Sequence, residues 1–199
     1  MNRGAPRCEL RPKSKRKSKP TGRMTPVACE YRLLGQGDAV MLAATAADCY
    51  VPYYAHLWLP GAMQAYLAAT YEPARVVAEL GDPNVRFELA SLAGTAVGFA
   101  KLELRHDRVG LPNAAYLERV YVSPRVLGRG VGRMLVARAC AAAAAAGRAS
   151  IWLRAMASSA RPIASYETQG FVSCGVEPFD SPGMIDAERP MVVMVKPLA

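Results

Sequence analysis

The chain has 199 residues, of which 52% are hydrophobic, and this is enough to bury the core of one domain. Its formal net charge is +9, but residues 1–23 hold nine basic side chains and one acidic one, so the rest is almost neutral. This distribution argues against a nucleic-acid-binding surface on the folded part. The longest stretch without Lys, Arg, Asp or Glu, residues 49–71, contains Pro52 and Pro60 and would make a poor membrane span.

The five cysteines do not occur at the short paired spacings that zinc sites and redox motifs require. We therefore expect reduced thiols and no metal site. The basic start of the chain is not followed by the apolar segment of a secretory signal. The sequence thus predicts a cytoplasmic protein.

Residues 1–28 are predicted to form a disordered basic tail, and residues 29–199 a single folded domain. Like charges follow one another in residues 11–20, and their mutual repulsion opposes folding. The tail is interpreted as a flexible solvated segment or as an upstream extension of a protein that begins at Met24. A nucleic-acid or nuclear-targeting patch is the other hypothesis, although no aromatic residues are interleaved as a stacking platform requires.

The first half of the domain shows strand and helix patterns with clear start and stop signals. Asp38 can cap a helix, Pro73 suits a first helical turn, and Ala93-Gly94 is typical of a hairpin. The patterns predict a strand at 29–34, a helix from about residue 39, helices at 61–70 and 73–80, and strands at 85–92 and 95–104.

An aromatic cluster lies between the first two predicted helices and contains Tyr50, Tyr53, Tyr54, His56 and Trp58. Two interpretations stay open. The rings could pack the helices onto the core. Alternatively, Tyr53, Tyr54 and His56 line a pocket for the substrate.

The stretch from Glu118 to Arg133 passes from an apolar, β-branched run through a glycine-rich loop into an alanine-rich helix that ends near Ala146. Without Cβ atoms, the loop allows its backbone N–H groups to approach an anion, and the helix dipole adds to the positive potential. Arg129 and Arg133 add full charges. The pattern predicts a diphosphate site, while the spacing excludes a dinucleotide fingerprint and a P-loop.

The remaining patterns predict a strand at 150–155, a helix at about 162–169, and closing strands at 171–176 and 191–196. A polar loop at 105–113 precedes the strand at 116–122, and His106 beside Asp107 in that loop is interpreted as surface. The order of elements predicts an α/β (α+β) domain with a central sheet of six to seven strands flanked by helices.

The glycine loop resembles that of the GNAT superfamily, the Gcn5-related N-acetyltransferases. Members usually carry Gln or Arg, two variable residues, Gly, one variable residue, and then Gly or Ala. Gly130 and Gly132 match this pattern, Gly128 is an additional glycine, and Leu127 occupies the Gln or Arg position. The resemblance extends over about residues 29–197. It implies the GNAT fold, with a mixed and strongly twisted sheet, and acetyl-CoA as the acetyl donor.

A second family feature is the segment from Tyr166 to Phe171, which is similar to the Tyr-x-x-x-Gly-Phe signature. In the family this tyrosine lies near the thioester sulfur and can protonate the departing CoA thiolate. A hydroxyl group suits this step because it donates a hydrogen bond to a developing anion. Tyr166 is therefore the implied catalytic acid, and simple packing between helix and sheet is the alternative.

The resemblance also implies that the strand before the loop diverges from the strand at 150–154. The opening would admit the pantetheine arm, and a free strand N–H would polarise the acetyl carbonyl. The implied cofactor-binding residues are Val120, Tyr121, Val122, Leu127, Gly128, Arg129, Gly130, Val131, Gly132 and Arg133.

Glu118 is the candidate general base. An ammonium substrate must lose a proton before it attacks a carbonyl. Glu118 lies two residues before Val120 and is expected on the same strand face, where it would act through water. The alternative is an ordinary ion pair with Arg119 or Arg154.

Scattered segments are most similar to the PaiA-type branch, which is associated with acetylation of spermidine and spermine. They are residues 66–67, 79–80, 82–83, 97–102 and 117–122. The resemblance implies direct transfer to a primary amine in a ternary complex, with a polyamine as acceptor and a homodimer as in many relatives. The other hypothesis is a CoA-binding regulatory or nucleic-acid-associated protein without catalysis, which Leu127 and the basic tail favour.

Overall fold

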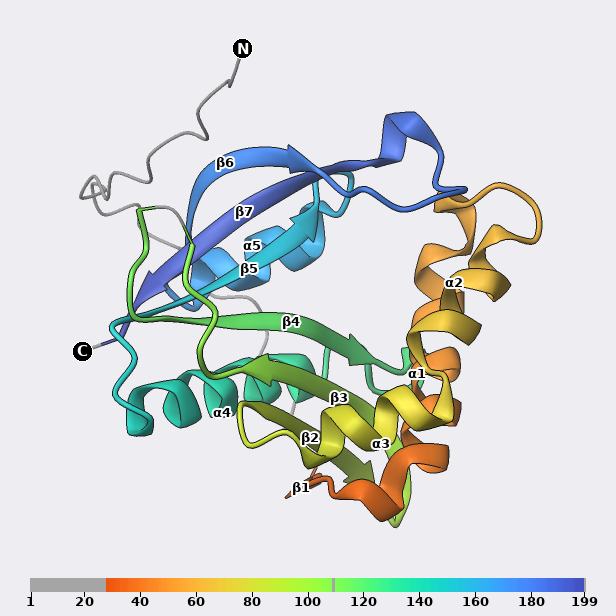
Figure 1. Ribbon diagram of the computed structural model, residues 1–199, viewed down its shortest axis with the longest axis horizontal. Helices are drawn as coiled ribbons and strands as arrows, with labels where there is room; N and C mark the ends of the chain where they lie inside the picture. The colour runs from red at the N-terminus through yellow and green to blue at the C-terminus, as the bar shows by residue number, and fades with distance from the viewer. Residues whose placement is uncertain (1–27, 109, 199) are drawn as a thin grey trace.

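The computed structural model describes residues 28–108 and 110–198 (Figure 1). The predicted tail therefore lies outside the described residues, apart from Ala28. Within the described part, seven strands form one mixed sheet in the order β1-β2-β3-β4-β5-β7-β6. The strands are β1 (Glu30–Leu33), β2 (Val85–Leu92), β3 (Thr95–Glu103), β4 (Ala114–Val122), β5 (Ser150–Met156), β6 (Val172–Pro178) and β7 (Pro190–Pro197).

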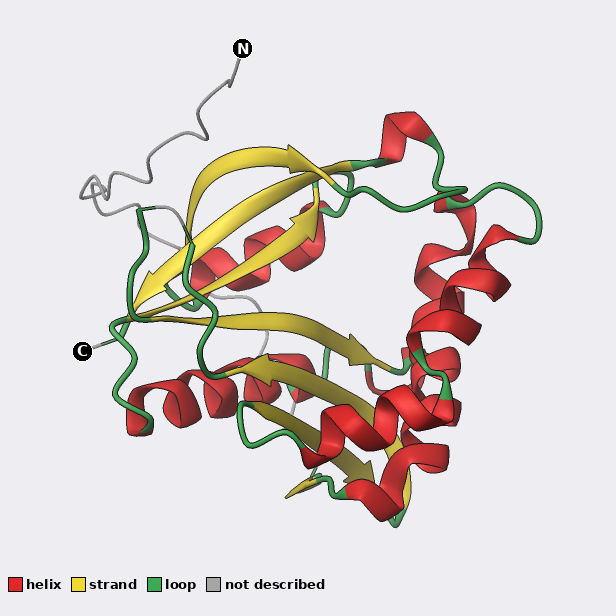
Figure 2. Cartoon of the chain, viewed as in Figure 1, coloured by secondary structure: helices red, strands yellow, loops and turns green. Residues whose placement is uncertain are grey.

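Helices cover both faces of the sheet (Figure 2). On one face, α4 packs onto β2 to β5 with small and branched side chains. On the other face, α1 and α3 pack onto the large rings of Phe87 and Phe99. None of the described helices is long and apolar enough to cross a membrane. The helices are α1 (Ala39–Tyr54), α2 (Ala62–Thr70), α3 (Pro73–Gly81), α4 (Val131–Ala145) and α5 (Ala160–Thr168).

The predicted mixed sheet with flanking helices is confirmed, and each predicted element is present with ends that differ by a few residues. The main difference concerns α1, which continues through Pro52 to Tyr54. A proline removes one helical N–H donor but does not end this helix. Tyr50, Tyr53 and Tyr54 therefore belong to α1 and not to a connection between helices.

Among the described strands, β4 and β5 form the one parallel pair. They are paired only from Ala114 to Leu117 and from Ser150 to Leu153. Beyond these residues the two strands separate, as Figure 1 shows, although β4 continues to Val122 and β5 to Met156. The edge of β4 that faces β5 is therefore free of strand pairing over its second half, as the family resemblance implied.

A β-bulge in β4 decides which side chains face this opening. Lys101 of β3 pairs with Arg119 and the next residue of β3 pairs with Leu117, so Glu118 is the extra residue. Leu117 and Val120 pack into the core beneath α4. Glu118 and Arg119 instead form an ion pair with each other on the opposite face, beside Lys101. The expectation that Glu118 shares a face with Val120 is wrong because the bulge interrupts the alternation of side chains.

Close contact between β3 and β4 limits the residue at Gly98. A Cβ atom there would lie 2.8 Å from the carbonyl oxygen of Tyr121 and 3.3 Å from the Cα of Val122. We predict that Gly98→Ala lowers the free energy of unfolding by about 1–3 kcal/mol, because backbone atoms cannot move aside as a flexible side chain can. Urea unfolding measures the change. Gly37→Ala, which has nothing within 4 Å of its Cβ position, is the matched control; equal losses in the two variants would contradict the argument.

Candidate active site

Two adjoining cavities lie where β4 and β5 diverge. The first has a volume of about 110 Å³ and is lined mainly by tyrosine, phenylalanine and methionine side chains; we call it the aromatic cavity. The second has a volume of about 320 Å³ and is lined by α1, β4, α5, Leu127 of the glycine loop and the first two turns of α4; we call it the loop cavity. Two cavities with a common wall can bring two reactants together. The residues that line both are Tyr54, Val120, Tyr121, Pro162 and Tyr166.

The N-terminus of α4 presents backbone donors in the glycine loop. Gly130 has φ = +84°, a left-handed conformation that glycine adopts without strain. The helix ladder begins with the N–H of Met134, which donates to the carbonyl of Gly130 at 2.9 Å. Within the described part of the chain, the amides of residues 131–133 have no backbone acceptor. Together with the helix dipole, they form an anion-binding end.

The predicted cofactor residues do not all line the loop cavity. Val131 is 2% exposed and its side chain is part of the core, whereas Gly128, Arg129 and Gly130 are exposed in the loop. A Cβ at Gly132 would lie 3.3 Å from Val122 Cγ2, so this glycine allows α4 to approach β4. The predicted residues that line the cavity are Val120, Tyr121, Val122, Leu127, Gly132 and Arg133.

Local structure explains the segment from Tyr166 to Phe171. Gly170 has φ = +90° just after α5 ends, and the N–H of Phe171 donates back to the carbonyl of Tyr166 at 3.1 Å. Phe171 is 1% exposed, and its ring lies 5.8 Å from the Tyr166 ring, centroid to centroid. The buried phenylalanine thus anchors the turn that positions Tyr166.

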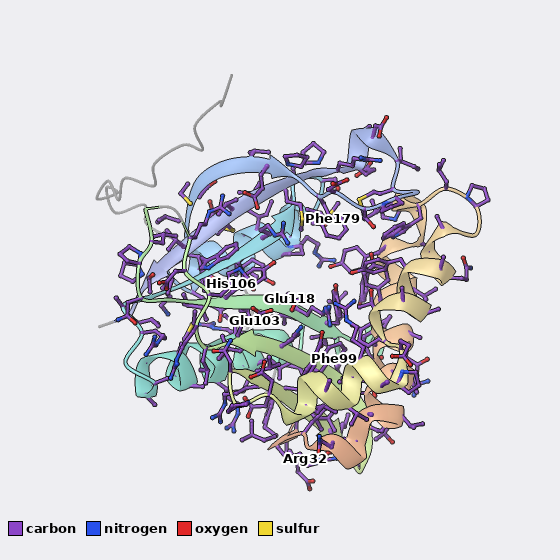
Figure 3. All side chains as sticks on the ribbon, viewed as in Figure 1. Arg32, Phe99, Glu103, His106, Glu118 and Phe179 are labelled. Carbon is purple, nitrogen blue, oxygen red and sulfur yellow. The ribbon has the colours of Figure 1, made fainter. Side chains whose placement is uncertain are left out.

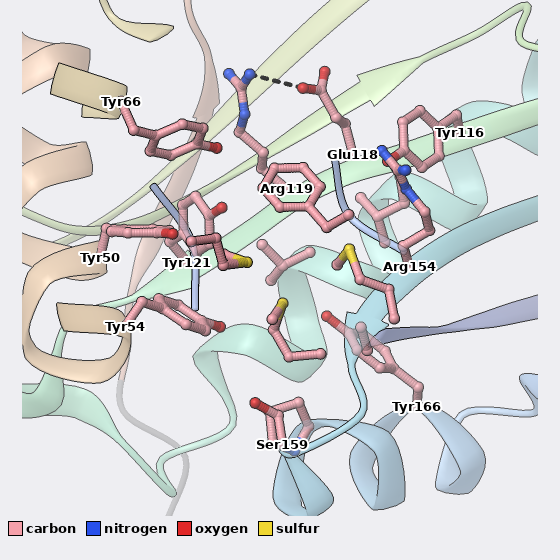
Figure 4. Close-up of a pocket in the computed structure, with 18 residues that line it drawn as sticks. Tyr50, Tyr54, Tyr66, Tyr116, Glu118, Arg119, Tyr121, Arg154, Ser159 and Tyr166 are labelled. Atoms are coloured by element: carbon pink, nitrogen blue, oxygen red, sulfur yellow. Dashed lines mark hydrogen bonds and ion pairs between the residues drawn. The ribbon is translucent and has the colours of Figure 1, made fainter. Parts of the chain in front are cut away.

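The hydroxyl groups of Tyr54 and Tyr166 enter the aromatic cavity from α1 and α5 (Figure 4). Burial raises the pKa of Tyr166 above its ordinary value, and the nearby Tyr54 contributes in the same direction. The Tyr166 hydroxyl therefore keeps its proton at neutral pH. It is a hydrogen-bond donor at the wall that the two cavities share.

Glu118 belongs to a buried cluster of charges beside the aromatic cavity. Its Oε2 atom lies 2.6 Å from Lys101 Nζ, and its Oε1 atom lies 2.7 Å from Arg119 Nη2. Lys101 also lies 3.0 Å from Glu79 Oε2 on α3. Lys101 and Arg119 are 4% and 6% exposed, so each buried cation requires these partners. The ion pair with Arg119, one alternative from the sequence, is confirmed.

The electrostatics keep Glu118 ionised. Burial by itself would raise its pKa, but Arg119 and Lys101 outweigh burial and the net pKa lies below the ordinary value. Arg154 does not join this cluster. Its Nε donates to the Tyr116 hydroxyl at 3.0 Å, and its Nη1 donates to Glu177 at 3.4 Å.

Glu103 and His106 connect this buried cluster of charges to the surface. Its Nδ1 lies 2.5 Å from Glu103 Oε2, and Lys101 Nζ lies 3.8 Å from the other oxygen of Glu103. Figure 3 shows His106, Glu103 and Glu118 close together at the middle of the sheet. The His106 side chain is 40% exposed. The interpretation of His106 as surface is thus incomplete, because the loop folds back onto the end of β3.

The three residues that were expected to line one substrate pocket, Tyr53, Tyr54 and His56, do not line the same cavity. Tyr54 lines both cavities, but Tyr53 lines only the loop cavity. His56 is exposed and lines neither cavity. The expectation is wrong for His56 because it lies in a short 3₁₀ turn in which Leu57, 1% exposed, is the residue that faces inward.

Sequence reasoning missed several side chains of both cavities. Arg154 and Tyr116 line the aromatic cavity, and Arg161 lines the loop cavity. An arginine within an otherwise buried strand, as in Leu153-Arg154-Ala155, is the signal that could have indicated Arg154. The others depend on how α5 and β4 are placed in space.

A mixed sheet whose fourth and fifth strands diverge over a glycine loop and helix N-terminus is the fold of GNAT acetyltransferases. Residues 43–171 match the family model described as the Acetyltransferase (GNAT) family. The chain belongs to this family.

The chain is similar to curated and solved members of the family. An IAA acetyltransferase of Azospirillum brasilense is 33% identical over 96 residues, which cover 48% of this chain and 60% of that protein. The chain thus spans less than two thirds of that relative. The PaiA N-acetyltransferase of Thermoplasma acidophilum, solved in complex with coenzyme A, has a TM-score of 0.68 at 20% identity, with 86% of this chain and 99% of that chain covered.

A Gcn5-related N-acetyltransferase of Rhodopseudomonas palustris has a TM-score of 0.70 at 22% identity, with 89% of this chain and 100% of that chain covered. At these identities the two solved structures support the fold.

The charge cluster makes a prediction about stability. We expect Lys101→Met to lower the free energy of unfolding by about 3 kcal/mol or more at pH 7.5, because Glu118 and Glu79 lose a shared cation. Without Lys101 the folded-state pKa of Glu118 rises, because burial is then opposed by Arg119 without the second cation. The penalty is therefore present above that pKa and shrinks as the pH falls and the groups bind protons.

Urea unfolding at pH 7.5 and pH 5 tests this expectation. Lys196→Met is the matched control, since Lys196 has no ion pair among the described residues. A loss for Lys101→Met that is the same at both pH values would argue against the electrostatic explanation.

Proposed function

We propose that the protein is an acetyl-CoA-dependent N-acetyltransferase, in which a primary amine attacks the acetyl carbonyl directly in a ternary complex. The observation that carries this proposal is the pair of cavities with a common wall at the divergence of β4 and β5. One cavity ends at an anion-binding helix N-terminus, and the other holds an ionised carboxylate. Membership of the GNAT family supports the same conclusion.

The loop cavity fits the chemistry of coenzyme A. The free amides of residues 131–133 and the Arg133 side chain would hold the pyrophosphate. Arg161 on α5 lines the same cavity and supplies a cation, whereas Leu127 occupies the family's Gln or Arg position. The unpaired edge of β4 from Val120 to Val122 would hydrogen-bond the pantetheine arm.

Tyr166 is the proposed catalytic acid. Its hydroxyl lies at the common wall and stays protonated because burial raises its pKa. It would donate its proton to the sulfur that leaves when the acetyl group is transferred. Tyr54, from the opposite side of the cavity, is placed to orient the acetyl group or the amine (Figure 4).

Glu118 is the proposed base, acting through water. As a carboxylate held by two cations it is a weak base, so its main effect is to stabilise the departing proton near the amine. The pair of Glu103 and His106 then offers a route for that proton to the exposed side of the sheet. A cytoplasmic location and a homodimer stay predictions, and a polyamine is the acceptor suggested by the PaiA resemblance.

The function is tested with Tyr166→Phe. We expect kcat for amine acetylation to fall about 100-fold, since the proton donor is lost, while calorimetry shows acetyl-CoA binding changed by no more than about threefold. Release of free CoA thiol in the presence of a panel of primary amines measures turnover. Tyr31→Phe is the matched control, because Tyr31 on β1 packs against Arg138 and lines neither cavity. A parent protein that binds CoA but acetylates no amine would favour the non-catalytic alternative.

The pH dependence tests both assigned roles. With the pKa of Tyr166 raised, the rate of the parent enzyme should rise with pH and show no alkaline fall up to about pH 10. Glu118→Gln should lower kcat/KM about 10- to 100-fold at pH 7, with a smaller loss as the pH approaches the pKa of the amine itself. Glu167→Gln, exposed on α5, is the control. A pH-independent loss in Glu118→Gln would refute the assignment of Glu118 as base.

A further inference from the structure

Aromatic rings and methionines make up most of the lining of the aromatic cavity, beside the charged side chains of Glu118, Arg119 and Arg154. Trp58 and Tyr66 are stacked with ring centroids 4.7 Å apart, and the Tyr66 ring meets Phe179 edge-on at 6.3 Å. The thioethers of Met156, Met184 and Met191 also line the cavity. Rings bury large areas at a small entropic cost and methionine adapts to irregular shapes, so such walls suit a flat or branched apolar group.

Two guanidinium groups already line the aromatic cavity, and one of them lies over two of its rings. The guanidinium carbon of Arg154 lies 5.7 Å from the centre of the Tyr116 ring and 5.9 Å from that of Phe179. Arg119 also lines the cavity, and its guanidinium carbon lies 5.4 Å from the centre of the Tyr71 ring, which is not part of the lining. An additional ammonium group in this cavity would therefore meet two guanidinium groups and be repelled by them.

The cavity also lacks a spare carboxylate for a polycation. Among the charged side chains that line it, Glu118 is the one acid, beside Arg119 and Arg154. Both oxygens of Glu118 already form ion pairs, one with Lys101 and one with Arg119. A substrate with several ammonium groups would leave the additional charges unpaired, at a high cost of desolvation.

The volume of the cavity fits a compact group. An apolar cavity of about 150 Å³ can hold benzene, and the aromatic cavity has about 110 Å³. The aromatic cavity is thus smaller than a cavity that encloses benzene, and a compact substrate would fill it and extend into the space at the common wall. An extended polyamine would reach out of it past Arg154.

From these observations we propose that the acceptor is a monoamine with an aromatic or branched apolar body, and not a polyamine. The proposal rests on the proposed acetyl transfer at this site and names its substrate class. The single amine lies at the wall of Tyr54 and Tyr166, and the body of the substrate lies among Tyr66, Phe179 and the methionines.

The experiment compares 2-phenylethylamine, 3-methylbutylamine and spermidine as acceptors for the full-length protein with saturating acetyl-CoA, followed by release of CoA. We expect kcat/KM for 2-phenylethylamine to exceed that for spermidine at least about 10-fold. Equal values, or a preference for spermidine, would overturn the acceptor class while leaving the acetyltransferase function in place. Turnover of none of the three, with acetyl-CoA binding intact by calorimetry, would overturn the proposed function and this proposal with it.

A charge-insertion variant tests whether the cavity walls set this preference. Met191→Glu places a carboxylate in the cavity and should shift the kcat/KM ratio at least about 10-fold toward spermidine. Met191→Gln, of similar length and neutral, should lower turnover of 2-phenylethylamine without raising that of spermidine. Val176→Glu adds the same charge at a site that is 61% exposed and should leave the ratio unchanged.

Thermal unfolding of each variant establishes that it is folded. If folded Met191→Glu leaves the ratio as in the parent, or Val176→Glu shifts it equally, the aromatic cavity does not select the acceptor.

Discussion

Strand pairing between β4 and β5 ends at Leu117 and Leu153. The position of both cavities depends on this early end of the pairing. In a continuous sheet the backbone groups of Val120 and its neighbours would be used by the adjacent strand. Here they border both cavities, so a ligand can take the place of the missing strand. The same divergence allows α1 and α5 to bring Tyr54 and Tyr166 to one wall from opposite sides. In the proposed reaction, one interruption of backbone pairing would thus provide both the binding edge and the meeting point of the two reactants.

The β-bulge adds a second constraint, since it places Glu118 and Arg119 on the same face of the sheet. Adjacent charged residues that both face inward require partners of opposite charge. Glu118 pairs with Arg119 and with Lys101 of β3, and Lys101 pairs in turn with Glu79 of α3. These ion pairs stabilise the cluster. They also neutralise the negative charge of Glu118, since each of its oxygens lies next to a cation. In the proposed reaction, such a carboxylate would assist the loss of one proton, but it would bind a polycation weakly because both its oxygens are already paired. Under the proposed function, the electrostatic stability of the fold and the selection of the acceptor would depend on the same residues.

The two cavities differ in the chemical character of their linings. The loop cavity presents free amides and the arginines Arg133 and Arg161, which suit phosphate groups. The aromatic cavity presents rings, thioethers and charges that are already paired. A charged donor and an apolar acceptor would each find a matching surface, and Tyr166 lies where the two surfaces meet.

The sequence by itself determined the elements whose signals are local. Glycines at left-handed positions, the turn from Tyr166 to Phe171 and the hairpin at Ala93-Gly94 depend on backbone preferences of neighbouring residues, so they could be predicted along with the family. Tertiary structure alone decided the facing of Glu118, the exposed position of His56 and the entry of Arg154 into the aromatic cavity. The positions of Glu118 and Arg154 depend on a bulge and on the separation of two strands, and that of His56 depends on which residue of its 3₁₀ turn packs inward. All three arise from packing between residues that are far apart in the chain.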